Sequence, residues 1–186
     1  MIGAFRIIAH AIASADGMIA DATGAQPASL QLEADARYFT ASLDSVEAIV
    51  HGRQSHEGQP NSARRRRLVL TRHVASLAPD PDHPNSRLWN PAGAPLDEAL
   101  AALGVKSGTI AVIGGPQVYS LFLKWGYDVF HLSRAVKVRL PGGLPVFSRD
   151  KFGGDPEAAM TAAGLRPSLT RRLDEEVSVT DWTPAG

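Results

Sequence analysis

A short apolar segment that ends in two glycines constrains the fold of this chain more than any other feature. Residues 110–113 are four apolar residues typical of a buried strand, Gly114 and Gly115 follow directly, and an apolar helical pattern covers residues 117–124. A turn without side chains lets a ligand lie against the backbone, and the start of the helix offers free N–H groups to an anion. The segment therefore predicts either a turn that binds the pyrophosphate of a dinucleotide or only a compact corner of an α/β fold.

Composition limits the kinds of protein that this chain can be. A length of 186 residues suits one domain, residues 1–186, and 19 Lys and Arg balance 19 Asp and Glu, so no overall field favours nucleic acid or an anionic membrane. The absence of cysteine excludes disulfides and thiolate chemistry and fits a reducing compartment. The N-terminus lacks the pattern of a signal peptide, and no apolar run reaches the roughly 18 residues of a membrane span. We expect a cytoplasmic protein that binds neither nucleic acid nor membranes.

Strand and helix patterns alternate along the chain. The following elements are expected: strands at 5–13, 47–53, 67–72, 87–89, 109–113, 128–133 and a terminal pair within 165–182, and helices at 33–43, 96–103 and 117–124. Residues 73–95 are expected to be mostly irregular, and 140–147 to form a Gly/Pro loop. The alternation predicts an α/β fold with a mixed, mostly parallel central sheet and an antiparallel C-terminal edge.

Polar residues follow three of the predicted strands. Gly52, Arg53 and Ser55 follow the second strand, Thr71 and Arg72 the third, and the Gly-Gly pair the later one. Ligands of open α/β sheets bind at the carboxyl ends of the strands, and a guanidinium there suits the 2′-phosphate of NADPH. The set predicts NADPH in preference to NADH; the alternative is that both arginines are solvated surface residues.

Five motifs, in this order, resemble the dihydrofolate reductase superfamily. They are residues 13–20 (ASADGMIA), 50–55 (VHGRQS), 67–72 (RLVLTR), 113–119 (IGGPQVY) and 128–133 (DVFHLS). The resemblance covers residues 5–148 and implies a three-layer fold with helices on both faces of the sheet, NADPH as cofactor and a small-molecule substrate. It implies cofactor contacts from Ala13, Asp16, Gly17, Ile19, Ala20, Gly52, Arg53, Ser55, Thr71, Arg72, Ile113, Gly114, Gly115, Gln117, Val118 and Tyr119. It implies Asp35 as the catalytic residue, with substrate contacts from His10, Phe39, Arg65 and Ser133.

Two branches of this superfamily compete. Residues 14–20 and 142–147 (GGLPVF) resemble the reductase domain of the riboflavin-biosynthesis deaminase-reductase and its stand-alone relatives, which implies a ribosylaminopyrimidine substrate and a homodimer. Asp35 falls where dihydrofolate reductases carry their folate-binding carboxylate, but the Gly-Asp-Thr and the tryptophan typical of those enzymes are absent. We therefore favour the riboflavin branch over dihydrofolate reduction. A non-catalytic nucleotide-binding protein on the same fold is a further alternative.

Several residues admit a second interpretation. Asp35 can simply favour a helix N-terminus, and His10 can be a core residue rather than a cleft residue. The arginine run 64–67 is interpreted as a solvated strand entry, although Arg65 also falls near the position that binds the substrate carboxylate in dihydrofolate reductases. The six histidines (10, 51, 56, 73, 83 and 131) show no metal-binding spacing. Loops 21–30 and 54–66 are expected to line the substrate site, and the segment 177–182 is expected to offer an apolar edge strand for dimerisation.

Overall fold

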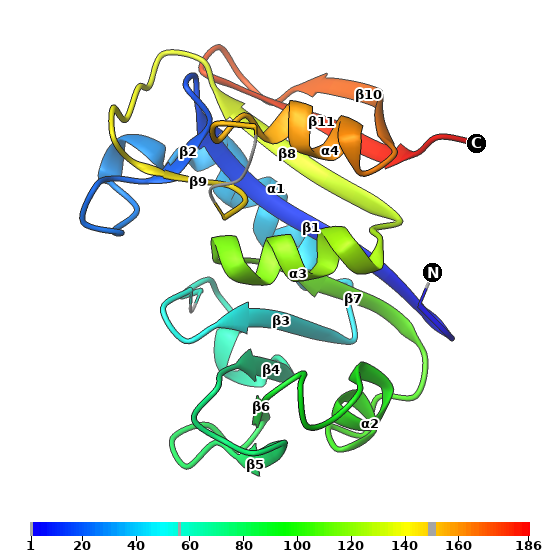
Figure 1. The fold of residues 1–186 in the computed structure, drawn as a ribbon. Coiled ribbons are helices and arrows are strands. Elements are labelled where there is room, and N and C mark those ends of the chain that lie inside the picture. The colour runs from blue at the N-terminus through cyan, green and yellow to red at the C-terminus, as the bar shows by residue number, and fades with distance from the viewer. Residues whose placement is uncertain (1, 56, 149–151) are drawn as a thin grey trace.

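The computed structural model describes residues 2–55, 57–148 and 152–186 and contains a nine-stranded sheet in the order β10-β11-β8-β1-β7-β3-β4-β6-β5 (Figure 1). Its strands are β1 (Phe5–Ser14), β3 (Ala48–Gly52), β4 (Arg67–Leu70), β5 (Leu77–Pro79), β6 (Ser86–Trp89), β7 (Gly108–Val112), β8 (Val129–Ala135), β10 (Leu165–Arg172) and β11 (Val177–Pro184). The six strands from β8 to β6 in this order are parallel, and antiparallel strands flank them on both sides. The predicted mixed sheet with an antiparallel C-terminal edge is confirmed.

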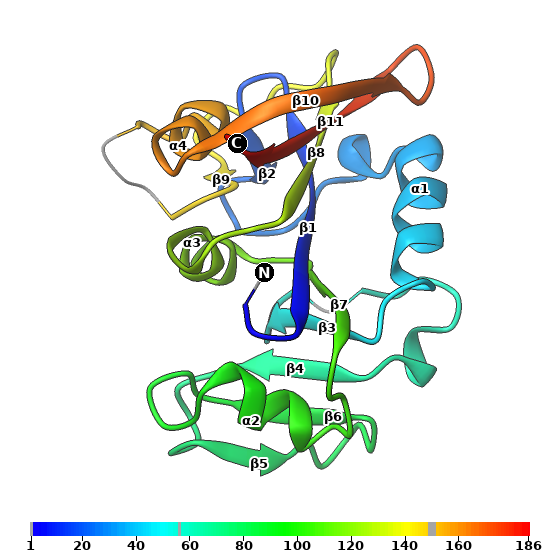
Figure 2. The ribbon, with the colours of Figure 1, turned by 90° about the vertical axis from the view of Figure 1, so that its right-hand side faces the viewer.

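Helices cover both faces of this sheet (Figure 2). One face carries α1 (Glu33–Leu43), and the other carries α2 (Leu96–Ala101), α3 (Pro116–Trp125) and α4 (Pro156–Ala162). Single turns of 3-10 helix occur at Ala28–Leu30 and Ser62–Arg64. No helix in the part of the chain that the structure describes has the length and apolar character needed to cross a membrane.

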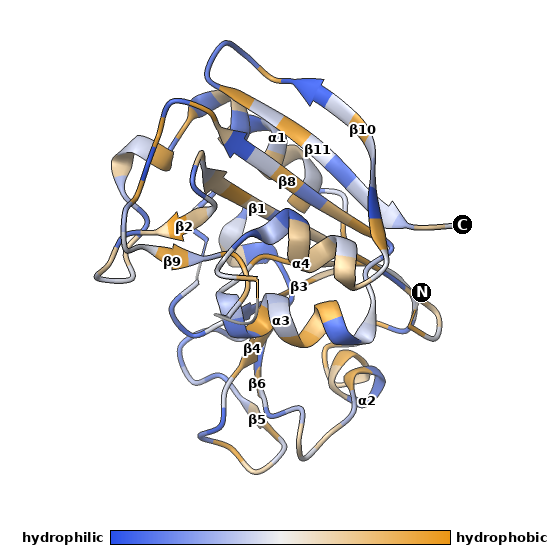
Figure 3. Ribbon diagram, turned by 45° about the horizontal axis from the view of Figure 1, so that its top comes forward, coloured by the Kyte–Doolittle hydropathy of each residue, from blue (hydrophilic) through white to orange (hydrophobic). Residues whose placement is uncertain are grey.

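The central strand β1 is buried on both faces, which explains its long apolar run. Ile7 and Ala9 belong to the large cluster under α2, α3 and α4, whereas Ile8 packs with Leu43 on the α1 side. This division follows from the alternation of side chains along a strand. In Figure 3, hydrophobic colour lies on the central strands and α3, whereas β10 is mostly white and blue. The core therefore lies between the middle of the sheet and its helices, with the polar strand β10 at the rim.

A second, two-stranded sheet pairs β2 (Met18–Ala20) with β9 (Leu144–Pro145). This sheet brings together the two motifs at residues 14–20 and 142–147. A Cβ on Gly143 would lie 2.3 Å from the carbonyl oxygen of Ala20, so only glycine allows this approach. The Gly/Pro segment 140–147, which we expected to be a loop, therefore contains a short strand.

The structure corrects three other expectations. β5 lies within the segment expected to be mostly irregular, and α4 was not predicted at all. α4 is only seven residues long, and the Asp155 side chain caps it by accepting bonds from the N–H groups of Glu157 and Ala158. The segment 177–182 is not an edge strand, because β11 pairs with both β8 and β10. The edge strand on this side of the sheet is β10, whose side chains are mostly polar, although its Leu169 is exposed.

Candidate active site

A cleft of about 1370 Å³ opens at the carboxyl ends of the parallel strands. It is larger than the roughly 300–1,000 Å³ that ordinarily encloses one small ligand. One wall is formed by α1 and by the second half of β1. The other wall is formed by the segments that follow β3, β4 and β7. The cleft therefore has room for a dinucleotide and a second small molecule together.

Most residues that the sequence analysis assigned to ligands line this cleft. Those assigned to the cofactor and found in its wall are Ile19, Ala20, Gly52, Arg53, Ser55, Thr71, Arg72, Ile113, Gly114, Gly115, Gln117, Val118 and Tyr119. Those assigned to the substrate or to catalysis and found there are His10, Asp35, Phe39 and Ser133. The loops expected at 21–30 and 54–66 also contribute, including Gly24, Leu30, Glu57 and Gln59.

The Gly-Gly turn forms a close-packed wall between β3 and β7. The N–H of Gly52 donates to the carbonyl oxygen of Gly114 at 2.7 Å, and the N–H of Ser55 donates to Gly52 at 3.0 Å. Gly114 has a φ of 120°, which L-residues rarely adopt, and a Cβ on Gly115 would lie 3.2 Å from Ser55 Oγ. Both positions therefore keep the backbone open toward the cleft because they lack side chains.

The next residues begin α3. Its N-cap residue, Gly115, is extended and provides no side-chain cap, and Pro116 lies at the first helical position. Because Gln117 is in the first turn and lines the cleft, the positive end of the helix faces the open volume. Such an end favours an anion.

Two exposed arginines and a buried threonine complete this side of the cleft. Arg53 follows β3 and Arg72 follows β4, and both side chains are exposed. Thr71 is 5% exposed, and its hydroxyl accepts the N–H of His73 at 3.1 Å. The wall therefore combines two guanidinium groups with a hydroxyl, which suits phosphate oxygens.

The opposite wall carries a carboxyl group in an apolar setting. Asp35, in the first turn of α1, is only partly exposed, and burial raises the pKa of its carboxyl above the ordinary value. A hydrogen bond with the Ser133 hydroxyl opposes this shift in pKa but does not cancel it. Asp35 therefore binds a proton more readily than an exposed aspartate does.

His10 also lines the cleft, and at the same time it is a buried core residue with a hydrogen-bond partner. Its Nε2 lies 2.7 Å from the Ser42 hydroxyl, and its ring stacks on His131 with 4.5 Å between centroids. Burial, followed by the charge of His131, lowers the pKa of His10 well below its usual value. His131 in turn lies 2.6 Å from Asp181, which also pairs with Arg171 at 2.7 Å. His10 is therefore neutral at pH 7 and held by a polar network.

Four residues assigned to ligands lie outside the cleft. Ala13 is fully buried in the core, on the same face of β1 as Ala9 and Ala11. Asp16 and Gly17 line a separate depression beside α4, and the Asp16 carboxylate accepts bonds from Ser14 Oγ at 2.5 Å and from the N–H of Leu140 at 3.0 Å. This carboxylate anchors a turn and lines the separate depression, not the cleft.

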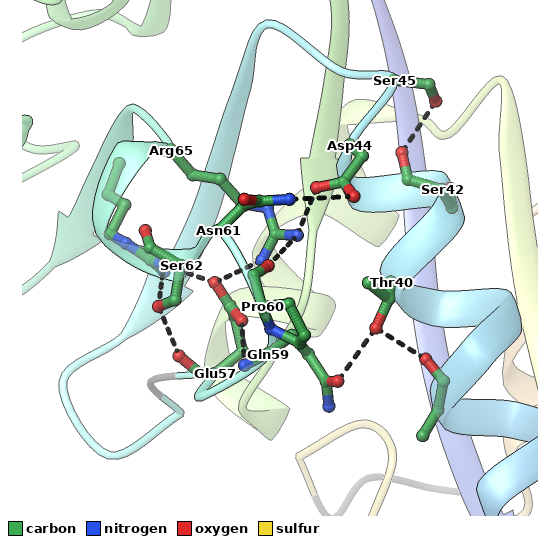
Figure 4. Close-up of polar contacts among 12 residues, drawn as sticks. Thr40, Ser42, Asp44, Ser45, Glu57, Gln59, Pro60, Asn61, Ser62 and Arg65 are labelled. Carbon is green, nitrogen blue, oxygen red and sulfur yellow. Dashed lines mark hydrogen bonds and ion pairs between the residues drawn. The ribbon is translucent and has the colours of Figure 1, made fainter.

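Arg65 is the fourth such residue. Its guanidinium lies 2.5 Å from Asp44 and 3.0 Å from Glu57, and its side chain is 7% exposed (Figure 4). Arg67 is also buried and pairs with Glu57. The arginine run is therefore not a solvated strand entry throughout: two of its four side chains are buried in ion pairs, while Arg64 and Arg66 are exposed.

Glu57 and Gln59 are cleft residues that the sequence analysis did not name individually, since only their loop was expected there. A polar Glu-x-Gln pattern in a loop carries no signal of its own. Among the described residues no group of three or more histidine or acidic side chains is arranged to hold a metal ion. His56 lies outside the described residues.

Comparison with known proteins finds solved structures that have a similar fold. No family model matches the chain, and no curated protein matches it. Among solved structures, a pyrimidine reductase-like protein from Corynebacterium diphtheriae has a TM-score of 0.66 at 17% identity, over 96% of this chain and 91% of that one. A protein assigned to riboflavin biosynthesis from Shewanella sp. PV-4 has a TM-score of 0.65 at 19% identity, over 97% and 99% of the two chains.

A third solved structure is a diaminohydroxyphosphoribosylaminopyrimidine deaminase/5-amino-6-(5-phosphoribosylamino)uracil reductase from Thermotoga maritima. Its TM-score is 0.65 at 17% identity, over 97% of this chain. This chain spans only 56% of the length of that protein. At these identities the likeness concerns the fold. The chain has the same α/β fold as these reductase and riboflavin-biosynthesis proteins, as the resemblance of its motifs predicted.

Proposed function

We propose that this protein is an NADPH-dependent reductase of a ribosylaminopyrimidine, of the 5-amino-6-(5-phosphoribosylamino)uracil type, or of a similar small heterocycle. The observation that carries the proposal is a single cleft with two chemically different walls. One wall has the Gly-Gly turn, a helix N-terminus and two arginines; the other has Asp35, Ser133 and His10. A fold alone does not define an activity, so the proposal depends on this pairing.

The first wall fits a dinucleotide phosphate. Gly114 and Gly115 let a pyrophosphate approach the backbone beside the first turn of α3, and Arg53 and Arg72 are exposed at neighbouring strand ends. A guanidinium can form two parallel hydrogen bonds to a phosphate group, which an unphosphorylated ribose cannot offer. This arrangement supports NADPH in preference to NADH.

The second wall supplies the proton that a reduction needs. Bound NADPH supplies a hydride, and the product must also gain a proton. Asp35 has a raised pKa and lies in the cleft, so its protonated carboxyl can donate there, while Ser133 holds its orientation. Phe39, one helical turn after Asp35, and the neutral His10 line the same cleft, and their rings meet edge to face with 5.8 Å between centroids.

Reduction of dihydrofolate is a second candidate, because a partly buried carboxyl with a raised pKa also suits a pterin ring. The absence of the tryptophan and the Gly-Asp-Thr that dihydrofolate reductases carry argues for the pyrimidine. The two candidates share the cofactor and differ in the substrate.

Titration of the protein with NADPH and with NADH tests the cofactor assignment. A charge-assisted contact to the 2′-phosphate contributes about 1.5–3 kcal/mol, so NADPH should bind roughly ten- to a hundredfold more tightly. Arg72→Ala should remove much of this preference. Arg64→Ala changes an exposed arginine outside the cleft and should leave it intact. Equal dissociation constants for the two cofactors in the wild type would refute the assignment.

A further inference from the structure

The helix α1, which carries Asp35 and Phe39 into the cleft wall, is held on the sheet by few apolar side chains. Figure 2 shows α1 on its own face of the sheet, apart from α2, α3 and α4. The buried residues of α1 are Ala34 and Leu43, and Leu43 packs in a small cluster with Ile8 of β1. A segment with so few buried apolar contacts is among the first to open locally. The polar contacts of α1 therefore decide how firmly this wall of the cleft is held.

Two histidines of the sheet contact the second half of α1. The Ser42 hydroxyl lies 2.7 Å from Nε2 of His10, and the Tyr38 hydroxyl lies 3.1 Å from Nδ1 of His131. The rings of Tyr38 and Phe39 also meet the ring of His10 edge to face, each with 5.8 Å between centroids. Both histidines therefore lie between the helix and the sheet.

The two histidines are neighbours on one face of the sheet. His10 of β1 is paired in register with His131 of β8, and their rings stack with 4.5 Å between centroids. His10 is 5% exposed, and the side chain of His131 is 14% exposed. Two imidazolium ions stacked at this distance repel each other, and burial disfavours the charged form of each ring. The pair therefore fits under α1 in its neutral form.

The charged groups around His131 leave this preference in place. Asp181 of β11 lies 2.6 Å from its Nδ1, but the same carboxylate oxygen pairs with Arg171 of β10 at 2.7 Å. Arg171 also donates to the Tyr38 hydroxyl at 3.0 Å. Burial lowers the pKa of His131 below its ordinary value; Asp181 opposes this shift, and the charges of Arg171 and Arg6 add to it. A proton on His131 is therefore disfavoured despite the neighbouring carboxylate.

His10 has no acidic partner among the described residues. The two carboxylates of α1 are engaged elsewhere, Glu33 with Arg37 and Asp35 with the Ser133 hydroxyl, and the neighbouring strand β7 has no charged residue. Burial, followed by the charge of the second histidine, lowers the pKa of His10 well below its ordinary value. This penalty disappears once α1 moves away and water reaches the ring. Protonation of His10 and binding of α1 to the sheet therefore oppose each other.

We propose that His10 and His131 form an acid-sensitive switch, which holds α1 on the sheet while both rings are neutral and releases it when they take up protons. The inference does not depend on the proposed function. Because α1 carries Asp35 and Phe39, its release would open that wall of the cleft. The larger core on the other face of the sheet includes neither histidine, so we expect it to stay folded.

The expected size of the effect follows from proton linkage. A ring that stays neutral under α1, but has its ordinary pKa of 6.5 once the helix is released, favours release about tenfold more for each pH unit below that value. Between pH 7.5 and pH 5.0 one such ring raises the opening equilibrium constant of α1 about 30-fold. A contribution from the second ring would raise this constant further.

Hydrogen exchange of the ligand-free protein, measured by mass spectrometry and corrected for the intrinsic pH dependence of exchange, tests the switch. The opening constant of the amides in α1 should rise at least about 30-fold from pH 7.5 to pH 5.0. At pH 5.0 these amides should open far more often than those of β7 in the centre of the sheet, because release of α1 leaves the core folded. Equal opening constants for α1 and β7 at pH 5.0 would mean global unfolding and would overturn the proposal. An opening constant of α1 that does not change with pH would also overturn it.

A variant that carries both His10→Gln and His131→Gln should reduce the pH effect on α1 to less than about threefold, because neither glutamine takes up a proton. Asp35 also titrates in acid and is present in this variant. A pH effect that survives would therefore belong to Asp35 and would overturn the proposal. The matched control His83→Gln changes an exposed histidine beside Asp80, outside the contact with α1, and should keep the full effect.

A second measurement needs no variant. In the wild type, the imidazole C–H signals of His10 and His131 in NMR spectra should titrate below the ordinary pKa of 6.5. Titration of both rings at that value would show that α1 does not oppose their protonation, and the proposal would be wrong. None of these outcomes concerns the binding of NADPH or a substrate, so the proposed function is tested separately.

Discussion

Replacing Glu57 by glutamine tests how the ion pairs under the cleft stabilise the protein. Glu57 Oε1 pairs with Arg67 and lies 3.0 Å from Arg65, and Oε2 accepts the N–H of Gln59 at 2.8 Å. The side chains of Glu57, Arg65 and Arg67 are 4%, 7% and 3% exposed. A glutamine in the same place would point its NH₂ group at a donor in either amide orientation, either at the guanidiniums or at the N–H of Gln59. Among the described residues, Asp44 would then be the one acidic partner left to the two buried guanidiniums.

Breaking a buried pair by removing one partner costs about 3–5 kcal/mol, because a buried charge is left uncompensated. We expect Glu57→Gln to lower the free energy of unfolding by this amount in urea denaturation at pH 7, with an unchanged m-value. The matched control is Glu33→Gln, which removes an ion pair between the exposed side chains of Glu33 and Arg37. That change should cost at most about 0.5 kcal/mol. A loss below about 1 kcal/mol in Glu57→Gln would refute the claim that these ion pairs stabilise the protein.

Three further predictions follow from the same geometry. Burial would raise the pKa of Glu57, but hydrogen bonds from Arg67 and Gln59 lower it more, so the stabilisation that Glu57 provides is present above pH 4.5 and is lost as pH falls through the lowered pKa. The difference in unfolding free energy between wild type and Glu57→Gln should therefore shrink in acid. A difference that stays constant with pH would contradict this. Gly115→Val should abolish NADPH binding by filling the space beside Ser55 while changing the Tm without cofactor only modestly; normal NADPH binding would mean that the Gly-Gly pair is only a structural turn. Light scattering should give a homodimer of 19.8 kDa chains, and a monomer mass across micromolar concentrations would refute that expectation, which now rests on the resemblance alone because β11 is not an edge strand.

The fold was predictable where a short sequence window determines the structure. The helix at 33–43 was predicted with the bounds that α1 has, because its apolar residues recur at helical spacing. The buried strands β1 and β7 were found from their apolar runs. β5 and β9 were missed because two- and three-residue strands exist only through their partners, β6 and β2. Such strands leave almost no local pattern.

The cleft was predictable for a topological reason, since residues that follow parallel strands must meet at one edge of the sheet. This placed Ser55, Thr71 and Gly115 correctly in its wall. Ala13 was assigned to the cofactor, but it is fully buried and does not line the cleft, whereas Ala11 on the same face of β1 does. The burial of Arg65 depends on Asp44 and Glu57, which are distant in sequence, so no local pattern indicates it.

The central claim is a reduction that uses NADPH and the Asp35 carboxyl, and the most direct measurement is the loss of NADPH absorbance with each candidate substrate. The wild type should reduce a ribosylaminopyrimidine phosphate faster than dihydrofolate. Its rate should fall as pH rises through the raised pKa of Asp35, because the protonated form is the donor. Asp35→Asn should lower turnover by a factor on the order of 10²–10⁴. Efficient reduction of dihydrofolate that is lost in Asp35→Asn would contradict the substrate assignment, and NADPH binding without turnover of either substrate would contradict the catalytic role.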